Sequence, residues 1–176
     1  MAYEGIGHMV STAQADFQVQ LVGQVLMYVN NDWERIIGNA MANPLMLMEP
    51  EVLKTIDQIL KVNQRIARSV GAPYLHQLVK IFDQLMKVYG HYSQNVSQSV
   101  QQGKSNPTVK PMKQVRRDIL KLIQIYIENE TNFDTFNQNI LPTLQQMVQD
   151  YADSNPQARD PETLMLFATI LSREGN

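Results

Sequence analysis

Apolar residues recur at helical spacing along almost the whole chain. The clearest stripe follows Pro50, and its members lie mostly three or four residues apart: Val52, Leu53, Ile56, Ile59, Leu60, Ile66 and Val70. Residues spaced in this way share one face of an α-helix, so the pattern predicts an amphipathic helix. Gly71 then supplies a C-terminal stop, and Pro73 favours the first turn of a second helix, which we predict over Pro73–Gln102.

The next segment changes from helical periodicity to turn residues and back. Gly, Ser, Asn and Pro cluster over Gly103–Val109, which predicts a loop, and a third helix is predicted to begin near Pro111. Residues Ile119–Ile127 are apolar enough to form a buried strand. We predict a helix there, because no breaker separates them from Arg116–Asp118 and no second strand signal exists.

Two further helical stretches complete the second half. One covers 133–151, with a break expected near Asn139–Leu141 because Pro142 removes a backbone donor and clashes one turn back. The other opens at Asp160, with Asp as the N-cap, Pro at the first helical position and Glu in the first turn.

The first fifty residues fit the same scheme more weakly. We predict helices over Tyr3–Val10, Phe17–Val29 and Trp33–Met41, with a joint between the last two at Asn30–Asp32. The lone pair of glycines at Gly5 and Gly7 is interpreted as close helix packing.

Helix starts near residues 51, 111 and 160 each open a pair of helices, so the pattern repeats. Its period of about 50–60 residues is slightly above the ~40–47 typical of HEAT and armadillo repeats. The predicted fold is therefore all-α, a HEAT-repeat α-solenoid of about three to four stacked antiparallel helix pairs. Residues 1–176 form a single HEAT-repeat segment, and we expect it to be a fragment of a longer receptor because it begins and ends within a pair.

Composition narrows the possible functions. Hydrophobic residues make up 44% of the chain, the net charge is −2 and cysteine is absent. No overall basic charge favours direct binding of nucleic acid, and no apolar run is long enough to cross a membrane. The absence of cysteine excludes disulfides, thiol nucleophiles and cysteine-based zinc sites within this sequence.

Residues capable of catalysis or metal binding do not form a recognisable motif. The three histidines His8, His76 and His91 lack metal-ligand spacing, and we interpret them as surface residues. Two carboxylate pairs, Glu128 with Glu130 and Asp150 with Asp153, are interpreted as solvated. We therefore predict no catalytic, cofactor-binding or metal-binding residue, no cofactor, and a protein that is not an enzyme.

One basic cluster stands out between residues 104 and 121. Its members are Lys104, Lys110, Lys113, Arg116, Arg117 and Lys121. It could contact an acidic partner or RNA, although no aromatic residue interleaves with it. A solvated helix face is the favoured interpretation.

A candidate partner surface lies on the helix predicted over Pro73–Gln102. Its apolar stripe must face neighbouring repeats, whereas a polar stripe at steps of three and four residues should face solvent on the concave side. The possible partner-facing residues are His76, Lys80, Gln84, Lys87 and His91. Such a polar and partly basic stripe suits an electrostatically steered contact.

Five collinear blocks carry a resemblance to a known family. They are AYEGIGHMV near the start, PEVLKTIDQILKVNQRIARSVGAPY at 50–74, MKQVRRDILKLIQIYIE at 112–128, ILPTLQQMVQDY at 140–151 and NPQARDPETLMLFATIL at 155–171. Together they resemble the middle-to-C-terminal HEAT repeats of the exportin-1 (chromosome region maintenance) family of karyopherins.

This resemblance implies a nuclear export receptor that binds Ran-GTP, cargo with leucine-rich export signals and nuclear pore proteins, and that shuttles between nucleus and cytoplasm. In that family the cargo groove precedes the present segment and contains a cysteine, so the segment is expected to lack it. The resemblance leaves open whether the segment alone binds any partner.

Two alternatives remain at this point. The first is a HEAT or armadillo scaffold of another type, either an importin-like carrier or a phosphatase scaffold subunit. The second is a helical enzyme, which a pocket with clustered, perturbed carboxylates or histidines would favour.

Overall fold

The computed structural model of the protein describes residues 2–103, 106–129 and 134–174. The described residues form helices and contain no β-strand. The α-helices are α1 (Ala2–Ser11), α2 (Ala15–Val25), α3 (Met27–Ala42), α4 (Pro50–Val70), α5 (Leu75–Gln101), α6 (Val109–Asn129), α7 (Asp134–Asn139), α8 (Leu141–Asp153) and α9 (Glu162–Glu174). Short 3₁₀ turns are η1 (Pro44–Met48), η2 (Ala72–Tyr74) and η3 (Pro156–Ala158).

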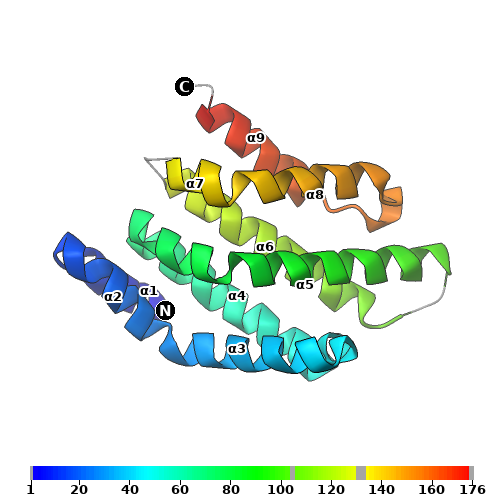
Figure 1. The fold of residues 1–176 in the computed structure, drawn as a ribbon, viewed down its shortest axis with the longest axis horizontal. Coiled ribbons are helices and arrows are strands. Elements are labelled where there is room, and N and C mark those ends of the chain that lie inside the picture. The colour runs from blue at the N-terminus through cyan, green and yellow to red at the C-terminus, as the bar shows by residue number, and fades with distance from the viewer. Residues whose placement is uncertain (1, 104–105, 130–133, 175–176) are drawn as a thin grey trace.

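The helices form two layers of stacked, antiparallel pairs (Figure 1). One layer contains α1, α4, α6 and α9, each packed against the next, and the other contains α2 with α3, then α5, then α7 with α8. The described residues thus hold three consecutive pairs and a further helix, α9. This arrangement confirms the predicted all-α, HEAT-type stack.

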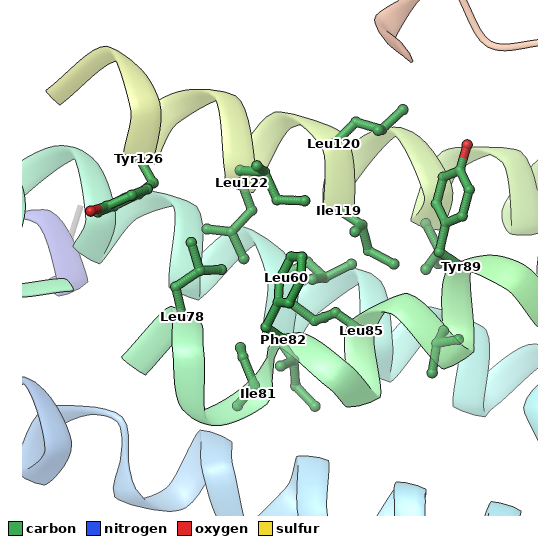
Figure 2. Close-up of a cluster of buried hydrophobic side chains, with 14 of the residues drawn as sticks. Leu60, Leu78, Ile81, Phe82, Leu85, Tyr89, Ile119, Leu120, Leu122 and Tyr126 are labelled. Atoms are coloured by element: carbon green, nitrogen blue, oxygen red, sulfur yellow. The ribbon is translucent and has the colours of Figure 1, made fainter. Parts of the chain in front are cut away.

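The centre of the stack is an apolar core shared by α4, α5 and α6 (Figure 2). Leu60 of α4, Leu78 and Leu85 of α5, and Ile119 and Leu122 of α6 are completely buried there. Each helix contributes residues at helical spacing, so burial of these stripes drives the three helices together. The residues of 119–127 belong to α6, which confirms the predicted helix.

The connection between α4 and α5 follows the predicted signals. Gly71 adopts a φ of 65°, a left-handed conformation that glycine tolerates at a helix C-terminus. Asn63 interrupts the apolar stripe of α4 and is buried within that helix. Its Oδ1 accepts a hydrogen bond of 2.7 Å from the hydroxyl of Tyr74 in η2, so it secures the turn from inside the core.

The break associated with Pro142 also occurs where the sequence predicted it. Helix α7 ends at Asn139 and α8 begins at Leu141, with Ile140 between them completely buried. The connection before α6 is shifted by one residue from the predicted loop, because α5 ends at Gln101 and Val109 already belongs to α6.

The predicted joint at Asn30–Asp32 is wrong. The chain bends at Leu26 instead, and residues 27–42 form one helix. Asn30 and Gln77 exchange two side-chain hydrogen bonds of 3.1 and 2.7 Å across the α3–α5 interface. The polar residue that suggested a break is thus a buried contact between neighbouring pairs.

Of the two glycines in α1, only Gly7 serves close packing. A Cβ built on Gly7 would lie 2.5 Å from the Cβ of Ser69, whereas one on Gly5 would meet nothing within 4 Å. Helix α1 therefore approaches α4 closely at Gly7.

Within the described ranges, no helix combines the length and the apolarity needed to cross a membrane.

Candidate functional site

The predicted partner-facing stripe lies along α5 but does not face solvent uniformly. His76, Lys80 and Lys87 are exposed, as expected, whereas Gln84 and His91 are half-buried. The expectation of exposure is therefore wrong for Gln84 and His91. They lie on the side of α5 that turns toward the first helix pair, a packing partner that periodicity along α5 alone does not reveal.

Helix α3 contacts this stripe directly. The indole Nε1 of Trp33 donates a hydrogen bond of 2.6 Å to Oε1 of Gln84, and Lys80 forms an ion pair of 3.2 Å with Glu34. Both side chains of the ion pair are more than half exposed, so it contributes little to stability. Lys87 forms no ion pair with any described residue, which makes it the available cation of the stripe.

A small apolar pocket of about 200 Å³ lies between α3, η1 and α5. Gln84, Lys87 and His91 line one side, so the structure brings three of the five predicted residues together. Ile37 and Met41 line the opposite side. The sequence did not associate these α3 residues with the site, because nothing in the local pattern relates them to α5.

His91 is the unusual polar group of this pocket. Its Nε2 atom is buried and has no hydrogen-bond partner among the described residues. Burial lowers the pKa of its imidazole, because the cation would lose hydration without gaining a partner. The pocket therefore combines an apolar wall with the Lys87 ammonium at its rim, and the neutral His91 ring forms part of its lining. It can accept a small apolar side chain next to an acidic or hydrogen-bonding group.

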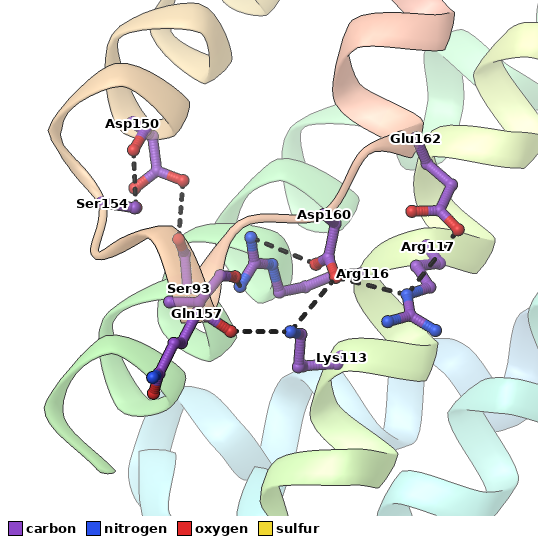
Figure 3. A network of polar contacts seen from close by, with 10 residues as sticks. Ser93, Lys113, Arg116, Arg117, Asp150, Ser154, Gln157, Asp160 and Glu162 are labelled. Carbon is purple, nitrogen blue, oxygen red and sulfur yellow. Dashed lines mark hydrogen bonds and ion pairs between the residues drawn. The ribbon is translucent and has the colours of Figure 1, made fainter. Parts of the chain in front are cut away.

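Part of the basic cluster makes an internal contact that neither interpretation made from the sequence predicted. Lys113, Arg116 and Arg117 converge on the carboxylate of Asp160 at 3.8, 3.3 and 3.2 Å (Figure 3). Lys110 and Lys121 are exposed, and Lys104 lies outside the described residues. Three of the six residues thus pair with a buried carboxylate, and one of them, Arg116, is itself buried.

Arg116 and Asp160 form the buried centre of this network. Their side chains are 2% and 0% exposed. The Arg116 guanidinium also donates to the carbonyl of Ala158 at 3.3 Å and lies 5.1 Å from the ring centroid of Tyr89. Asp160, predicted only as an N-cap, therefore holds the segment before α9 against α6. A sequence pattern cannot reveal this pairing, because the partners lie more than forty residues apart.

A second buried carboxylate was also missed. Asp118 of α6 accepts hydrogen bonds from Gln64 at 3.2 Å and Gln114 at 2.9 Å. Burial raises the pKa of Asp118, and the neighbouring carboxylate of Asp57 raises it further. Lys61 lies 2.7 Å from Asp57 and partly balances the pair. The only local signal was a charged residue within an otherwise apolar stripe.

Of the carboxylates considered from the sequence, Asp150 and Asp153 both accept hydrogen bonds within the protein. Asp150 accepts a hydrogen bond of 2.6 Å from Ser93, which links α8 to α5, and Asp153 accepts one from Gln149. Glu128 is exposed, and Glu130 lies outside the described residues. Across the part of the chain that the structure describes, no three His, Asp or Glu residues could together hold a metal ion.

Comparison with known proteins gives a consistent assignment. A family model described as CRM1 C terminal matches residues 77–176. The chain is 36% identical to Protein EXPORTIN 1B of Arabidopsis thaliana, 32% identical to Exportin-1 of Dictyostelium discoideum and 29% identical to Exportin-1 of Schizosaccharomyces pombe. Each alignment covers 97% of this chain and 16% of the relative, so the chain spans a small part of these relatives' length. Since the matched family model covers more than half of a chain that folds as stacked helix pairs, the protein belongs to the exportin-1 family, in its CRM1 C-terminal region.

Proposed function

We propose that this chain forms part of the solenoid of a nuclear export receptor. The complete receptor would bind Ran-GTP and cargo with leucine-rich export signals, contact nuclear pore proteins and move between nucleus and cytoplasm. The observation that carries this proposal is the continuous two-layer stack of helix pairs in a chain of the exportin-1 family. Family membership also favours this function over an importin-like carrier, a phosphatase scaffold or a helical enzyme.

The contribution of this segment is mechanical. In a solenoid each repeat contacts only its neighbours, so curvature depends on the interfaces between consecutive pairs. Each such interface here contains a buried or half-buried polar contact: Asn30 with Gln77, Gln64 with Asp118, Ser93 with Asp150, and Arg116 with Asp160. Apolar burial is non-directional, whereas a buried polar group that loses its partner costs about 1–3 kcal/mol, so these polar pairs must remain matched. They therefore fix the register of the arc while the apolar surfaces allow it to flex.

The surface of α5 would engage a partner of the complete receptor, either Ran or a pore protein. Exposed Lys80 and Lys87 supply positive charge, and the neighbouring apolar pocket supplies a small anchoring site. Charges at the rim of an interface change the association rate more than the lifetime of the complex.

The transport role can be tested in cells whose only export receptor lacks residues 50–129 of this segment. We expect a fluorescent reporter with a leucine-rich export signal to accumulate in the nucleus, because the arc is interrupted. A reporter whose signal leucines are replaced provides the control for full nuclear retention. Normal export of the first reporter would contradict the proposal.

The α5 surface can be tested separately in the complete receptor with Lys87→Glu. Association with Ran-GTP should slow at low ionic strength, and the difference should shrink when salt screens the charge. The matched control is Lys54→Glu, an exposed lysine on α4 in the other layer. Equal rates for the two variants at both salt concentrations would remove Lys87 from the Ran interface.

A further inference from the structure

A larger cavity lies where the N-terminal turns of α6 meet the end of α5 and the turn η3. Its volume is about 460 Å³. Lys110, Lys113 and Arg117 line it from α6, Ser99 lines it from α5, and Gln157 lines it from η3. No carboxylate is among the described residues that form its wall. The cavity therefore presents cations without an anion in the lining.

The three cations share one face of α6 because they are spaced by three and four residues. The buried carboxylate of Asp160 lies behind Lys113 and Arg117, and Glu162 lies 3.7 Å from Arg117 (Figure 3). Arg116, which does not line the cavity, also pairs with Asp160. Among these groups the cations outnumber the carboxylates, although the whole chain has a net charge of −2.

Several hydrogen-bond donors in the cavity remain available. Arg117 uses its Nε for Asp160, and neither of its Nη groups bonds to a described residue. Lys110 is exposed and forms no ion pair within the described ranges. The Ser99 hydroxyl accepts a hydrogen bond of 3.2 Å from Asn106, which leaves its proton free to donate. Lys113 is partly engaged, since it donates to the Gln157 carbonyl at 3.0 Å.

We propose that this cavity binds the phosphate group of a phosphorylated serine or threonine on a partner protein. A phosphate monoester carries nearly two negative charges at neutral pH and three acceptor oxygens, so it can engage more of these cations and donors at once than a single carboxylate can. The free Nη groups of Arg117 suit bidentate binding of phosphate oxygens, and the positive end of the α6 dipole adds to the attraction.

A nucleic acid fits the cavity less well. Binding of single strands combines a long basic groove with aromatic side chains on which bases stack. Here the cations are confined to one cavity, and none of the described residues in its lining is aromatic. This inference does not depend on the proposed transport role, because it rests only on the charges and donors of this cavity.

The test uses the chain itself and two probes, inorganic phosphate and a peptide with one phosphoserine. In NMR titrations at constant ionic strength, added phosphate should shift the backbone amide signals of Ser99, Gly103 and Lys110. Chloride added to the same ionic strength should shift these signals less. In fluorescence anisotropy, the phosphopeptide should bind more tightly than the same peptide with unmodified serine. Lys110→Gln should weaken this binding about fivefold at low salt, the upper range for one exposed charge contact.

The matched control is Lys121→Gln, an exposed lysine on the same helix that lies outside the cavity. Because Lys110 and Lys121 are both exposed, neither substitution should affect folding, which circular dichroism can verify. Equal weakening by both variants, or no amide shift with about 10 mM phosphate, would overturn the proposal, since a Kd above the millimolar range is not specific binding. Tighter binding of single-stranded RNA than of the phosphopeptide, with the same sensitivity to Lys110→Gln, would also overturn it in favour of nucleic acid.

Discussion

Replacing Asp160 should destabilise the protein far more than replacing the other carboxylate of the same network. Asp160 is fully buried and lies within 3.8 Å of three basic groups, one of which, Arg116, is itself 2% exposed. Asp160→Asn keeps the shape of the side chain but removes its charge. The Arg116 guanidinium would then remain buried with only the Ala158 carbonyl and the Tyr89 ring to offset its lost hydration.

The expected magnitude follows from the exposure of each partner. Breaking a buried ion pair by removing one charge costs about 3–5 kcal/mol of the free energy of unfolding. Lys113 and Arg117 can extend toward water, being 19% and 39% exposed, so they add little to this cost. Glu162→Gln is the control, because the Glu162–Arg117 pair is one-third exposed on both sides and contributes about 0–1 kcal/mol.

Urea unfolding followed by circular dichroism at neutral pH measures both variants, with equal slopes required for the comparison. A third variant separates the buried charge from general disruption. Arg116→Met in the Asp160→Asn background removes the uncompensated cation, so the double variant should be more stable than Asp160→Asn alone. The reasoning is refuted if Asp160→Asn costs no more than Glu162→Gln, or if the double variant is the least stable of the set.

Three further predictions concern packing, protonation and cargo. Gly7→Ala should lower the free energy of unfolding by about 1–3 kcal/mol in thermal or urea unfolding, because the new methyl group overlaps Ser69. Gly5→Ala should instead stabilise α1 by about 0.5–1 kcal/mol, because nothing lies near the new methyl group. A change of the same sign for both variants would contradict the close approach at Gly7. Burial lowers the pKa of His91 in the folded state. Below the ordinary pKa of 6.5 the unfolded state therefore binds more protons than the folded state. The free energy of unfolding should fall as the pH drops below that value. His91→Gln should reduce this loss of stability when urea unfolding is measured at pH 7 and at successively lower pH. The same pH dependence in the variant and the original protein would show that the imidazole is not effectively buried. A leucine-rich export peptide should not bind this chain with a Kd of about 10 μM or tighter in calorimetry, because helix-in-groove recognition needs a preformed apolar slot; binding at that affinity would place a cargo groove within the segment.

The sequence by itself determined the local elements of this protein. Apolar periodicity located α4, α5 and α6, Gly71 ended α4, and Pro142 marked the break between α7 and α8. These predictions succeed because helix formation depends on neighbours three and four residues away, and because glycine and proline restrict the backbone at their own positions. The repeat of helix pairs and five blocks of resemblance then sufficed to indicate the family.

The tertiary structure alone decided which polar residues are buried and what they contact. Asn30 suggested a joint but pairs with Gln77, the basic cluster suggested a solvated face but converges on Asp160, and His91 suggested a surface residue but lines a pocket. In each case the contacting residues come from another helix pair, so their identity depends on how the layers stack and not on local spacing. A polar residue looks the same in the sequence whether its side chain is hydrated or hydrogen-bonded to a distant helix. The free energies of these two states differ only once the neighbouring helix packs against the side chain and excludes water.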